Sequence, residues 1–431
     1  MTTVEHGAGP RAAGILAGMV LFAAACTTPP ATPTATAPSP GASDPTARPT
    51  PSGSPQLGVD WQRVYAVEQP PGDPLVTPPP ASGSGLSQHP GHYTGGMADL
   101  MDVAEGSDVL VAAGFFDEGP RAMVWTSSDG RSWAVAPAFP TGDGSIAYAV
   151  ASGPDGLVAG GVDGSDAAVW LSADGRTWQR VEQAAFHDDA APLEIRSLTR
   201  TEAGWLAAGF QGGIVHDLRA AFWRSTDGRT WQRVPDQPDF AKGRVEDLAM
   251  TPQGVVAVGS LGSYGQSEAG AVWRSTDGET WRREPTDGTF AGAVLRGVTA
   301  FGNGIVAVGS TDDDRAARSW VSEDGRSWTP SPADPAIDNH GLKILMRDVA
   351  VVDGQLIAGG HMLIGTQYSS AMLWRSTDGL RWERARDVPA FAGGIVEGLA
   401  SGGPGVVAVG TYGAPDLFIP TVWLSPAWPD A

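Results

Sequence analysis

Residues 57–431 are predicted to form an all-β fold, a seven-bladed β-propeller of four-stranded antiparallel blades, because of three features. A nine-residue phrase, of which WRSTDGETW at 273–281 is one copy, occurs six times. A second phrase, such as VVAVG at 255–259, occurs seven times. The segments show no helical periodicity, and glycine-containing turns separate short apolar runs, which is typical of antiparallel strands.

Each repeat is expected to contain four strands. In one copy these are 246–251, 255–259, 271–275 and 280–284, joined by a turn, a variable loop and a tight turn. The aspartates of the nine-residue phrase recur 45 to 54 residues apart, at Asp129, Asp174, Asp227, Asp277, Asp324 and Asp378. Spacing in that range, varying only between the motifs, is typical of propeller blades.

The seventh blade is predicted to combine both ends of the folded region. The chain ends with TVWLS at 421–425, a third strand with no fourth strand after it. Near the other end, GVDWQRV at 58–64 matches GRTWQRV at 175–181, which includes a fourth strand. We therefore expect the first folded strand to close the ring beside the last one, which removes exposed sheet edges.

The nine-residue phrase is interpreted as a structural turn. Gly278 is expected in a left-handed conformation, and Asp277 is expected to accept hydrogen bonds from turn amides. Trp273 and Trp281 are expected opposite each other on one face, and 14 of the 16 tryptophans occupy these two positions. Because six equivalent aspartates around a ring cannot converge on one substrate, no catalytic role is predicted for them.

These residues resemble the Asp-box, or bacterial neuraminidase repeat, of sialidases and related propellers, written S-x-D-x-G-x-x-W. Here the spacing is shortened to S-x-D-G-x-x-W, since Asp277 and Gly278 are adjacent. The resemblance covers nearly all of 57–431 through the repeat alone. It implies a propeller whose boxes are turns between third and fourth strands, remote from the active site, and it implies little about activity.

The N-terminal region is predicted to direct the protein out of the cytoplasm. Residues 1–25 are interpreted as a lipoprotein signal peptide, because a short apolar run with Ala24 and Ala25 precedes the single cysteine, Cys26. Ala23 departs from the lipoprotein pattern, which prefers Leu there, so an ordinary signal or an uncleaved anchor remain alternatives. Residues 26–56 are predicted to be a Pro/Thr-rich disordered tether. The expected location is extracytoplasmic, anchored by a lipid on Cys26 to the bacterial cell membrane.

Charge and composition disfavour some classes of binding partner. Acidic residues outnumber basic ones, 48 to 28, and the formal net charge of −20 disfavours nucleic acid. The sequence contains no Gly-rich phosphate loop, nucleophile elbow or zinc-like cluster, so no cofactor and no metal are predicted. The predicted partner is an unknown envelope protein or glycan, and the protein is expected to be a monomer.

A candidate ligand site comes from aligning the first strand of every repeat. One residue per blade falls at the same height around the central funnel, namely Met101, Tyr148, Arg196, Glu246, Arg296, Arg347 and Glu397. All except Met101 are proposed ligand-binding residues, since guanidinium groups suit carboxylates. The alternative is that these charges only pair with one another across water. The adjacent positions, such as Ala149, Ser197 and Gly297, are expected to be small or apolar.

Other loops offer weaker candidates. Residues 66–96 are long enough to cover the funnel, and His89 and His92 within them are possible metal ligands. Asp312–Asp314 form an acidic run that suits either calcium or solvent. Five phenylalanines recur before first strands and are expected to pack at blade junctions: Phe139, Phe186, Phe240, Phe290 and Phe391.

The leading function is a non-catalytic binding or scaffolding module for a protein, glycan or small anionic ligand. The alternative is a glycan-acting hydrolase, because sialidases also combine three arginines with a tyrosine–glutamate pair. The match fails in detail: no Arg-Ile-Pro is present, sialidases have six blades, and no acid/base aspartate can be assigned. A third hypothesis is an assembly factor for an envelope complex.

Overall fold

The computed structural model describes residues 61–65, 98–116, 120–136, 139–213, 216–263, 266–285, 288–311, 314–338, 342–364, 368–385, 389–402, 405–414 and 417–426. The predictions for Cys26, the signal peptide, the tether, His89, His92 and the loop 66–96 lie outside these residues. Within them no helix is long and apolar enough to cross a membrane.

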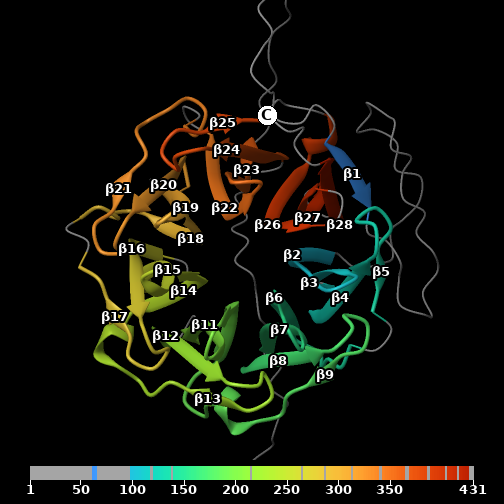
Figure 1. Cartoon of the computed structure of the whole chain (residues 1–431), viewed down its shortest axis with the longest axis vertical. Helices are drawn as coiled ribbons and strands as arrows, with labels where there is room; N and C mark the ends of the chain where they lie inside the picture. Colours follow the sequence, from blue (N-terminus) through green and yellow to red (C-terminus); the bar gives the residue numbers. More distant parts are fainter. Residues whose placement is uncertain are drawn as a thin grey trace, which may run out of the picture. The chain divides into compact units, whose positions relative to one another are not determined.

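Seven four-stranded antiparallel sheets surround a common centre, which confirms the predicted fold (Figure 1). Blades 1 to 3 contain β2 (Ala98–Glu105), β3 (Leu110–Phe116), β4 (Arg121–Ser127), β5 (Ala134–Val135); β6 (Ser145–Gly153), β7 (Gly156–Asp163), β8 (Asp166–Ser172), β9 (Gln179–Arg180); and β10 (Leu193–Thr201), β11 (Gly204–Gly213), β12 (His216–Ser225), β13 (Trp231–Arg233). Blades 4 and 5 contain β14 (Gly243–Thr251), β15 (Gly254–Ser263), β16 (Gln266–Ser275), β17 (Arg282–Arg283); and β18 (Val294–Phe301), β19 (Gly304–Thr311), β20 (Ala316–Ser322), β21 (Thr329–Pro330). Blade 6 contains β22 (Lys343–Val352), β23 (Gln355–Ile364), β24 (Tyr368–Ser376) and β25 (Glu383–Arg384).

Blade 7 joins the two ends of the folded region, as the sequence predicts. Its strands are β26 (Gly394–Gly402), β27 (Gly405–Ala414), β28 (Leu417–Pro426) and β1 (Gln62–Tyr65), in the order β26-β27-β28-β1. The antiparallel register pairs Arg63 with Trp423, and Figure 1 shows β1 beside β28. Trp61 is 5% exposed, so the short N-terminal strand also contributes an indole to the core.

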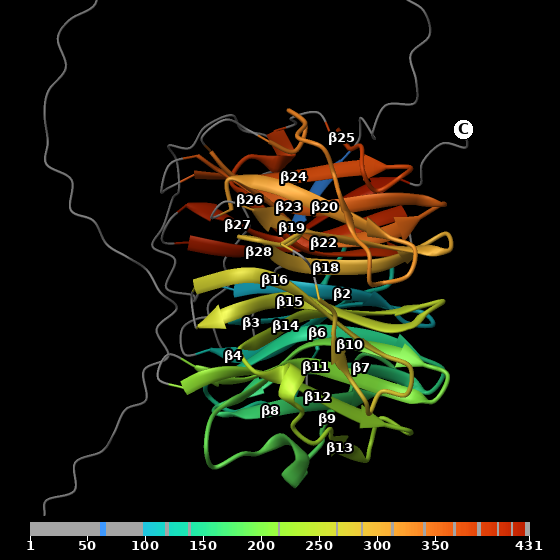
Figure 2. The same cartoon turned by 90° about the vertical axis from the view of Figure 1, so that its left-hand side faces the viewer.

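The core is distributed over the blade junctions. Among the described residues, seven apolar clusters occur, and each joins two neighbouring blades. The cluster that closes the ring packs Leu100 and Trp125 of blade 1 against Val409 and Leu424 of blade 7. Seen from the side, the strands of successive blades lie in layers across the propeller (Figure 2). Because each blade buries both faces against its neighbours, losing one strand exposes two junctions.

The Asp-box is a structural turn, as predicted. Gly278 has φ of 71°, and Asp277 Oδ1 accepts the amides of Glu279 and Thr280 at 2.8 and 2.7 Å. Ser275 Oγ accepts the amide of Gly278 at 2.8 Å. The box tryptophan closes the turn, because Trp281 Nε1 donates to the Gly278 carbonyl oxygen at 3.2 Å. Every donor is local, so each copy of the box stabilises its own turn.

One detail of that turn was predicted wrongly. Trp273 does not lie opposite Trp281; its cross-strand partner is Arg283. In blade 3 the equivalent box tryptophan, Trp231, lies opposite Ser225. In blade 3 the loop therefore comprises residues 226–230, which include the amides that bind the aspartate. Because Trp281 lies two residues before the partner of Trp273, the two indoles are diagonal neighbours on one face.

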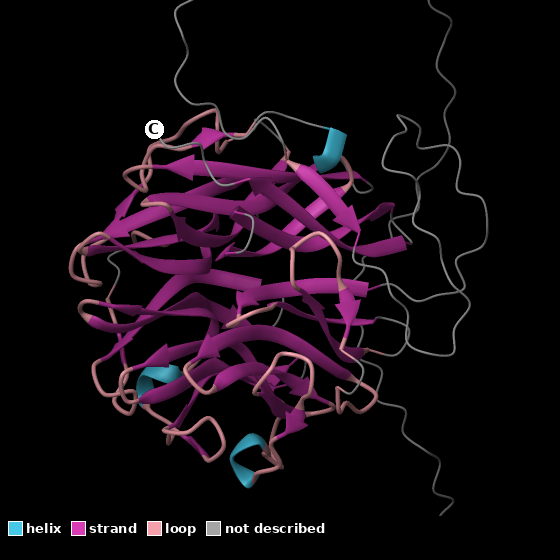
Figure 3. Cartoon of the chain, turned by 45° about the vertical axis from the view of Figure 1, so that its right-hand side comes forward, coloured by secondary structure: helices cyan, strands magenta, loops and turns pink. Residues whose placement is uncertain are grey.

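The recurring phenylalanines pack at the blade connections, as predicted. Phe139 lies 5.0 Å from Trp170 and 5.6 Å from Trp178, measured between ring centroids. Three of them end short 3-10 turns, Ala184–Phe186, Pro238–Phe240 and Pro389–Phe391, which are the cyan segments of Figure 3. Connections held by aromatic packing fix the position of the first strand that follows.

Candidate functional site

All seven residues aligned from the first strands line one central cavity, here called the funnel. Its volume is about 160 Å³, and it also contacts Asp102, Arg244, Asp247 and Asp348. The seven contributing strands are the innermost of their blades (Figure 1). The structure therefore brings the six proposed ligand-binding residues together with Met101: Tyr148, Arg196, Glu246, Arg296, Arg347 and Glu397.

A β-bulge directs each of these side chains into the funnel. In blade 5 the register passes from Leu295–Gly309 to Gly297–Val308, which leaves Arg296 as the extra, unpaired residue. The same shift occurs at the equivalent residue of every blade. An unpaired bulge residue turns its side chain away from the regular alternation of the strand. The ring is thus a consequence of backbone geometry.

The glycine that follows each second-strand apolar run makes the bulge possible. A Cβ on Gly309 would stand 2.0 Å from the Val294 carbonyl oxygen, and the equivalent glycines of the other six blades show 1.9 to 2.1 Å. These glycines are Gly114, Gly161, Gly209, Gly259, Gly360 and Gly410. A side chain at this position would clash with the bulged strand, so the repeated glycine is the sequence signal for the bulge.

Some of the charged side chains that line the funnel form ion pairs with one another. Arg347 Nη1 lies 3.0 Å from Glu397 Oε2, and Arg196 Nε lies 3.5 Å from Glu246 Oε2. The Arg196 guanidinium also lies over the Tyr148 ring, 3.9 Å from its centroid. These contacts are those expected if the funnel charges neutralise one another.

Arg296 is paired differently. Its Nη2 lies 2.9 Å from Oδ1 of Asp314, a residue with φ of 65° that also accepts the Ser310 hydroxyl. Asp314 was predicted in an acidic run suited to calcium or solvent, but its carboxylate is turned toward Arg296. Among the residues that the structure describes, the buried Nε atoms of Arg296 and Arg347 have no hydrogen-bond partner.

Three partly buried aspartates in the funnel were not predicted. Asp102, Asp247 and Asp348 occupy the position after the bulge residue, where only small or apolar residues were expected. Each bridges two blades: Asp247 Oδ2 accepts the Val298 amide of blade 5 at 2.8 Å, and Asp348 Oδ2 accepts the Leu399 amide of blade 7 at 2.8 Å. An aspartate in a strand buried on both faces needs such hydrogen-bond partners. Its presence in an otherwise apolar strand was therefore the sequence signal for a contact between blades.

The aspartates and Glu246 have opposite electrostatic environments. Burial, reinforced by the charge of Asp348, raises the pKa of Asp247 to about 7, and burial raises the pKa of Asp348 to about 6. The pKa of Asp102 is also raised, mainly by burial. Burial acts on Glu246 too, but Arg244 and Arg196 hold its pKa below the usual range. Glu246 therefore stays ionised.

A buried, neutral histidine lies next to the arginines of the ring. His361 of β23 is 3% exposed, and its Nδ1 has no hydrogen-bond partner among the described residues. Burial and the charges of Arg347 and Arg296 hold its pKa well below the usual value. The pKa of Arg296 is likewise lowered by burial and by Arg347. The two guanidinium groups of Arg296 and Arg347 therefore repel each other electrostatically, and a bound anion would reduce that repulsion.

Comparisons with known proteins give a fold likeness only. No family model matches the chain, and no curated protein matches it. Among solved structures, the chain is similar to Trypanosoma rangeli sialidase, with 12% identity, a TM-score of 0.45, and coverage of 76% of this chain and 54% of that one. The same sialidase in complex with the inhibitor DANA gives 11% identity, a TM-score of 0.43, and coverage of 76% and 55%. The chain spans about half the length of these structures, and a likeness this distant says nothing about activity.

Proposed function

We propose that the funnel is a non-catalytic binding site for a small anionic ligand, carried by a propeller that serves as a recognition module at the bacterial cell envelope. The observation that supports it most is the pair Arg296 and Arg347. Adjacent bulges place both in the funnel, and both have a buried Nε without a hydrogen-bond partner among the described residues. An oxyanion between them would accept those hydrogens and reduce the repulsion between two cations.

The state of Glu246 favours binding over hydrolysis. Because Arg244 and Arg196 keep its pKa low, Glu246 is a poor proton donor at neutral pH. Its carboxylate is also occupied, since Arg244 Nε lies 2.7 Å from Oε1 and Arg196 Nε lies 3.5 Å from Oε2. The alternative of a glycan-acting hydrolase would require Glu246 or Glu397 to take part in proton transfer.

A ligand screen tests the binding proposal. The melting temperature of the protein is measured with acidic sugars, small carboxylates and sulfate, in parallel with the variant Arg296→Ala/Arg347→Ala. A ligand at 100 times its Kd adds about 2.7 kcal/mol to the free energy of unfolding, which a melting curve resolves. We expect a stabilising ligand whose effect disappears in the variant.

The matched control is Arg318→Ala, which removes a half-buried arginine of blade 5 that does not line the funnel and whose Nη1 donates to the Pro332 carbonyl oxygen. It should leave the ligand effect unchanged. An unchanged melting temperature with every anion would contradict the proposal. Loss of glycan turnover in Glu246→Gln, at unchanged stability, would instead support the hydrolase.

The envelope location rests on the sequence around Cys26. Metabolic labelling with a radioactive fatty acid is expected to mark the protein, and Cys26→Ser is expected to abolish the label and release the protein from the membrane fraction. Equal labelling of both proteins would contradict lipid attachment at this cysteine.

A further inference from the structure

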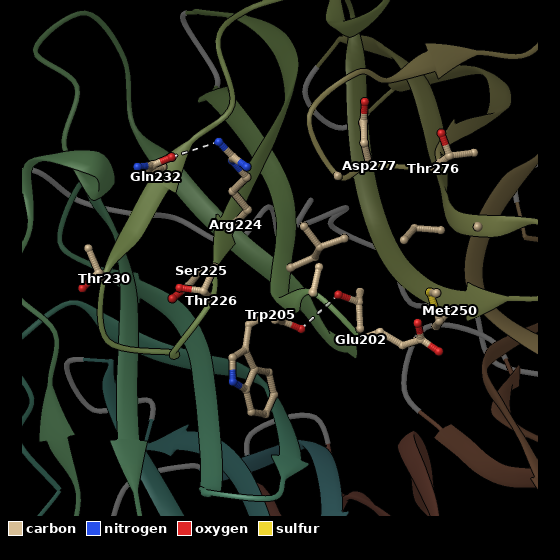
Figure 4. Close-up of a pocket in the computed structure, with 17 residues that line it drawn as sticks. Glu202, Trp205, Arg224, Ser225, Thr226, Thr230, Gln232, Met250, Thr276 and Asp277 are labelled. Atoms are coloured by element: carbon tan, nitrogen blue, oxygen red, sulfur yellow. Dashed lines mark hydrogen bonds between the residues drawn. The ribbon is translucent and has the colours of Figure 1, made fainter.

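A second cavity lies at the other end of the strands, away from the funnel. It occupies the junction between blades 3 and 4, has a volume of about 500 Å³, and shares no lining residue with the funnel. Figure 4 shows its walls, formed by the β10–β11 turn with Glu202, by Arg224 and Gln232 of blade 3, and by Met250 and the Asp-box of blade 4. We call it the junction groove.

The junction groove exists because one arginine is turned out of it. Arg224 of β12 pairs with Glu279, and its Nη2 donates to Gln232 Oε1 at 3.1 Å. Its side chain is 42% exposed. The three atoms nearest to a Cβ placed on Gly278, the box glycine of blade 4, all belong to Leu206, so Arg224 does not cover that glycine.

The next junction shows how such a space is filled. Arg274 of β16 is the equivalent of Arg224, yet its side chain is only 15% exposed. A Cβ on Gly325, the box glycine of blade 5, would stand 2.8 Å from Arg274 Nε and 3.0 Å from its Cδ. The guanidinium then reaches Glu284, with Nη1 3.1 Å from Oε1. In this junction an arginine stem covers the box glycine and its charge meets a carboxylate.

The junction groove offers the same partners to a side chain from outside. Leu206 and Val255 are buried at its base, and Met250 is the exposed large hydrophobic residue of the described chain, at 41%. A flexible methionine at the rim adapts to an alkyl stem. Glu202 stands exposed in the turn, and its carboxylate has no hydrogen-bond or ion-pair partner among the described residues. Glu202 and Met250 both line the groove and are labelled in Figure 4.

We propose that the junction groove binds a basic side chain, arginine or lysine, presented by a protein partner, as Arg274 occupies the next junction. The alkyl stem lies against Leu206, Met250 and Gly278, and the charge pairs with Glu202. The net charge of −20 favours the approach of a cationic partner. This site is separate from the funnel and does not depend on its ligand.

The test uses two peptides that differ in charge alone. The probes are acetyl-Gly-Arg-Gly-amide and the same peptide with citrulline, which keeps the shape of arginine without its charge. Affinity is measured by calorimetry, and the ¹³C-methyl resonance of Met250, assigned with Met250→Leu, locates the peptide. We expect the arginine peptide to shift that resonance in a saturable way and to bind three- to fivefold more tightly than the citrulline peptide.

Two variants distinguish the groove from general attraction to an acidic protein. Glu202→Gln is expected to reduce the affinity for the arginine peptide three- to fivefold. Asp155→Asn removes one charge from the corresponding turn of blade 2, where Asp155 is exposed, and is expected to leave the affinity unchanged. Melting curves confirm that both fold. Absence of binding, equal binding of the two peptides, binding without a Met250 shift, or equal effects of the two variants would overturn the proposal.

Discussion

The Asp-box turns and the funnel ring occupy the same blades but differ in how far their copies vary. All six boxes keep the serine, the Asp-Gly pair and the tryptophan, whereas the seven ring positions hold methionine, tyrosine, arginine or glutamate. In a box, each conserved group has a hydrogen-bond partner within the turn, as Asp277 has in the amides of Glu279 and Thr280. At a bulge the side chain leaves the sheet, so the backbone does not restrict its identity.

This contrast separates the Asp-box positions, which specify the fold, from the funnel positions, whose residues can vary with function. Positions with local partners repeat because every blade needs the same turn. Positions that project into the funnel diverge because only their shared environment constrains them. Experiments that affect one set without the other sharpen the distinction.

The largest effect is expected from removing the closing strand. Deletion of residues 57–64 takes Trp61 from the core and leaves the edge of β28 unpaired. Loss of a buried tryptophan alone is worth about 3–5 kcal/mol, so the deletion should lower the free energy of unfolding by more than about 5 kcal/mol. Chemical denaturation measures it. An unaffected unfolding curve would contradict closure of the ring by this strand.

The pH dependence of stability should differ between the two regions. Because Asp247 has a pKa of about 7 when folded and about 3.9 when unfolded, the folded state binds more protons between these values. Its contribution to stability is full below pH 4 and is lost as the pH rises to 7, by about 4 kcal/mol. Denaturation from pH 4 to pH 8 should show a smaller decline for Asp247→Asn than for the wild type. Equal slopes would show that Asp247 titrates normally.

The aspartates of the Asp-boxes should affect stability with the opposite pH dependence. The amides of Ser132 and Arg131 hold the pKa of Asp129 below its usual value. Its contribution is therefore present above about pH 4 and is lost as the pH falls further. The Asp129→Asn variant should differ from the wild type by about 1 kcal/mol at pH 6 and converge with it near pH 2. Parallel curves at all pH values would contradict this assignment.

The bulge glycine should tolerate an added methyl group less well than a glycine with open space around it. In Gly309→Ala, the new methyl group meets the Val294 carbonyl oxygen and should reduce stability by about 1–3 kcal/mol. The control is Gly213→Ala, where no atom lies within 4 Å of the added carbon. Thermal melting compares them, and similar melting temperatures would show that the bulge does not require glycine.

The sequence predicted the fold well because the boxes and apolar strands repeat, so each copy supports the assignment of the others. It also predicted the ring, since the spacing from Arg296 to the apolar run of β19 recurs in every blade. It did not reveal the bulges, because the glycine that indicates them also suits an ordinary strand end. It missed Asp102, Asp247 and Asp348, because their partners are amides of the neighbouring blade, which only the tertiary structure brings near.

The junction groove lies beyond sequence reasoning for a related reason. Arg224 and Arg274 occupy equivalent positions in nearly identical boxes, WRSTDGRTW and WRSTDGETW. One turns outward to Glu279 and the other lies across the next box glycine. Arg274 reaches Glu284 of its own blade, where blade 3 has Val234. Arg224 instead reaches Glu279 of the next blade, a contact that only the tertiary structure brings about.

The most direct test of the account compares one ring residue with one box residue in the same binding experiment. Calorimetry of Arg347→Ala and Asp277→Ala, with the anion that best stabilises the wild type, gives both affinities, and denaturation gives both stabilities. We expect Arg347→Ala to lose at least tenfold in affinity with a small change in stability. We expect Asp277→Ala to lose about 1 kcal/mol of stability and to bind unchanged. Unchanged affinity in Arg347→Ala, or an equal loss in both variants, would contradict the assignment of function to the ring.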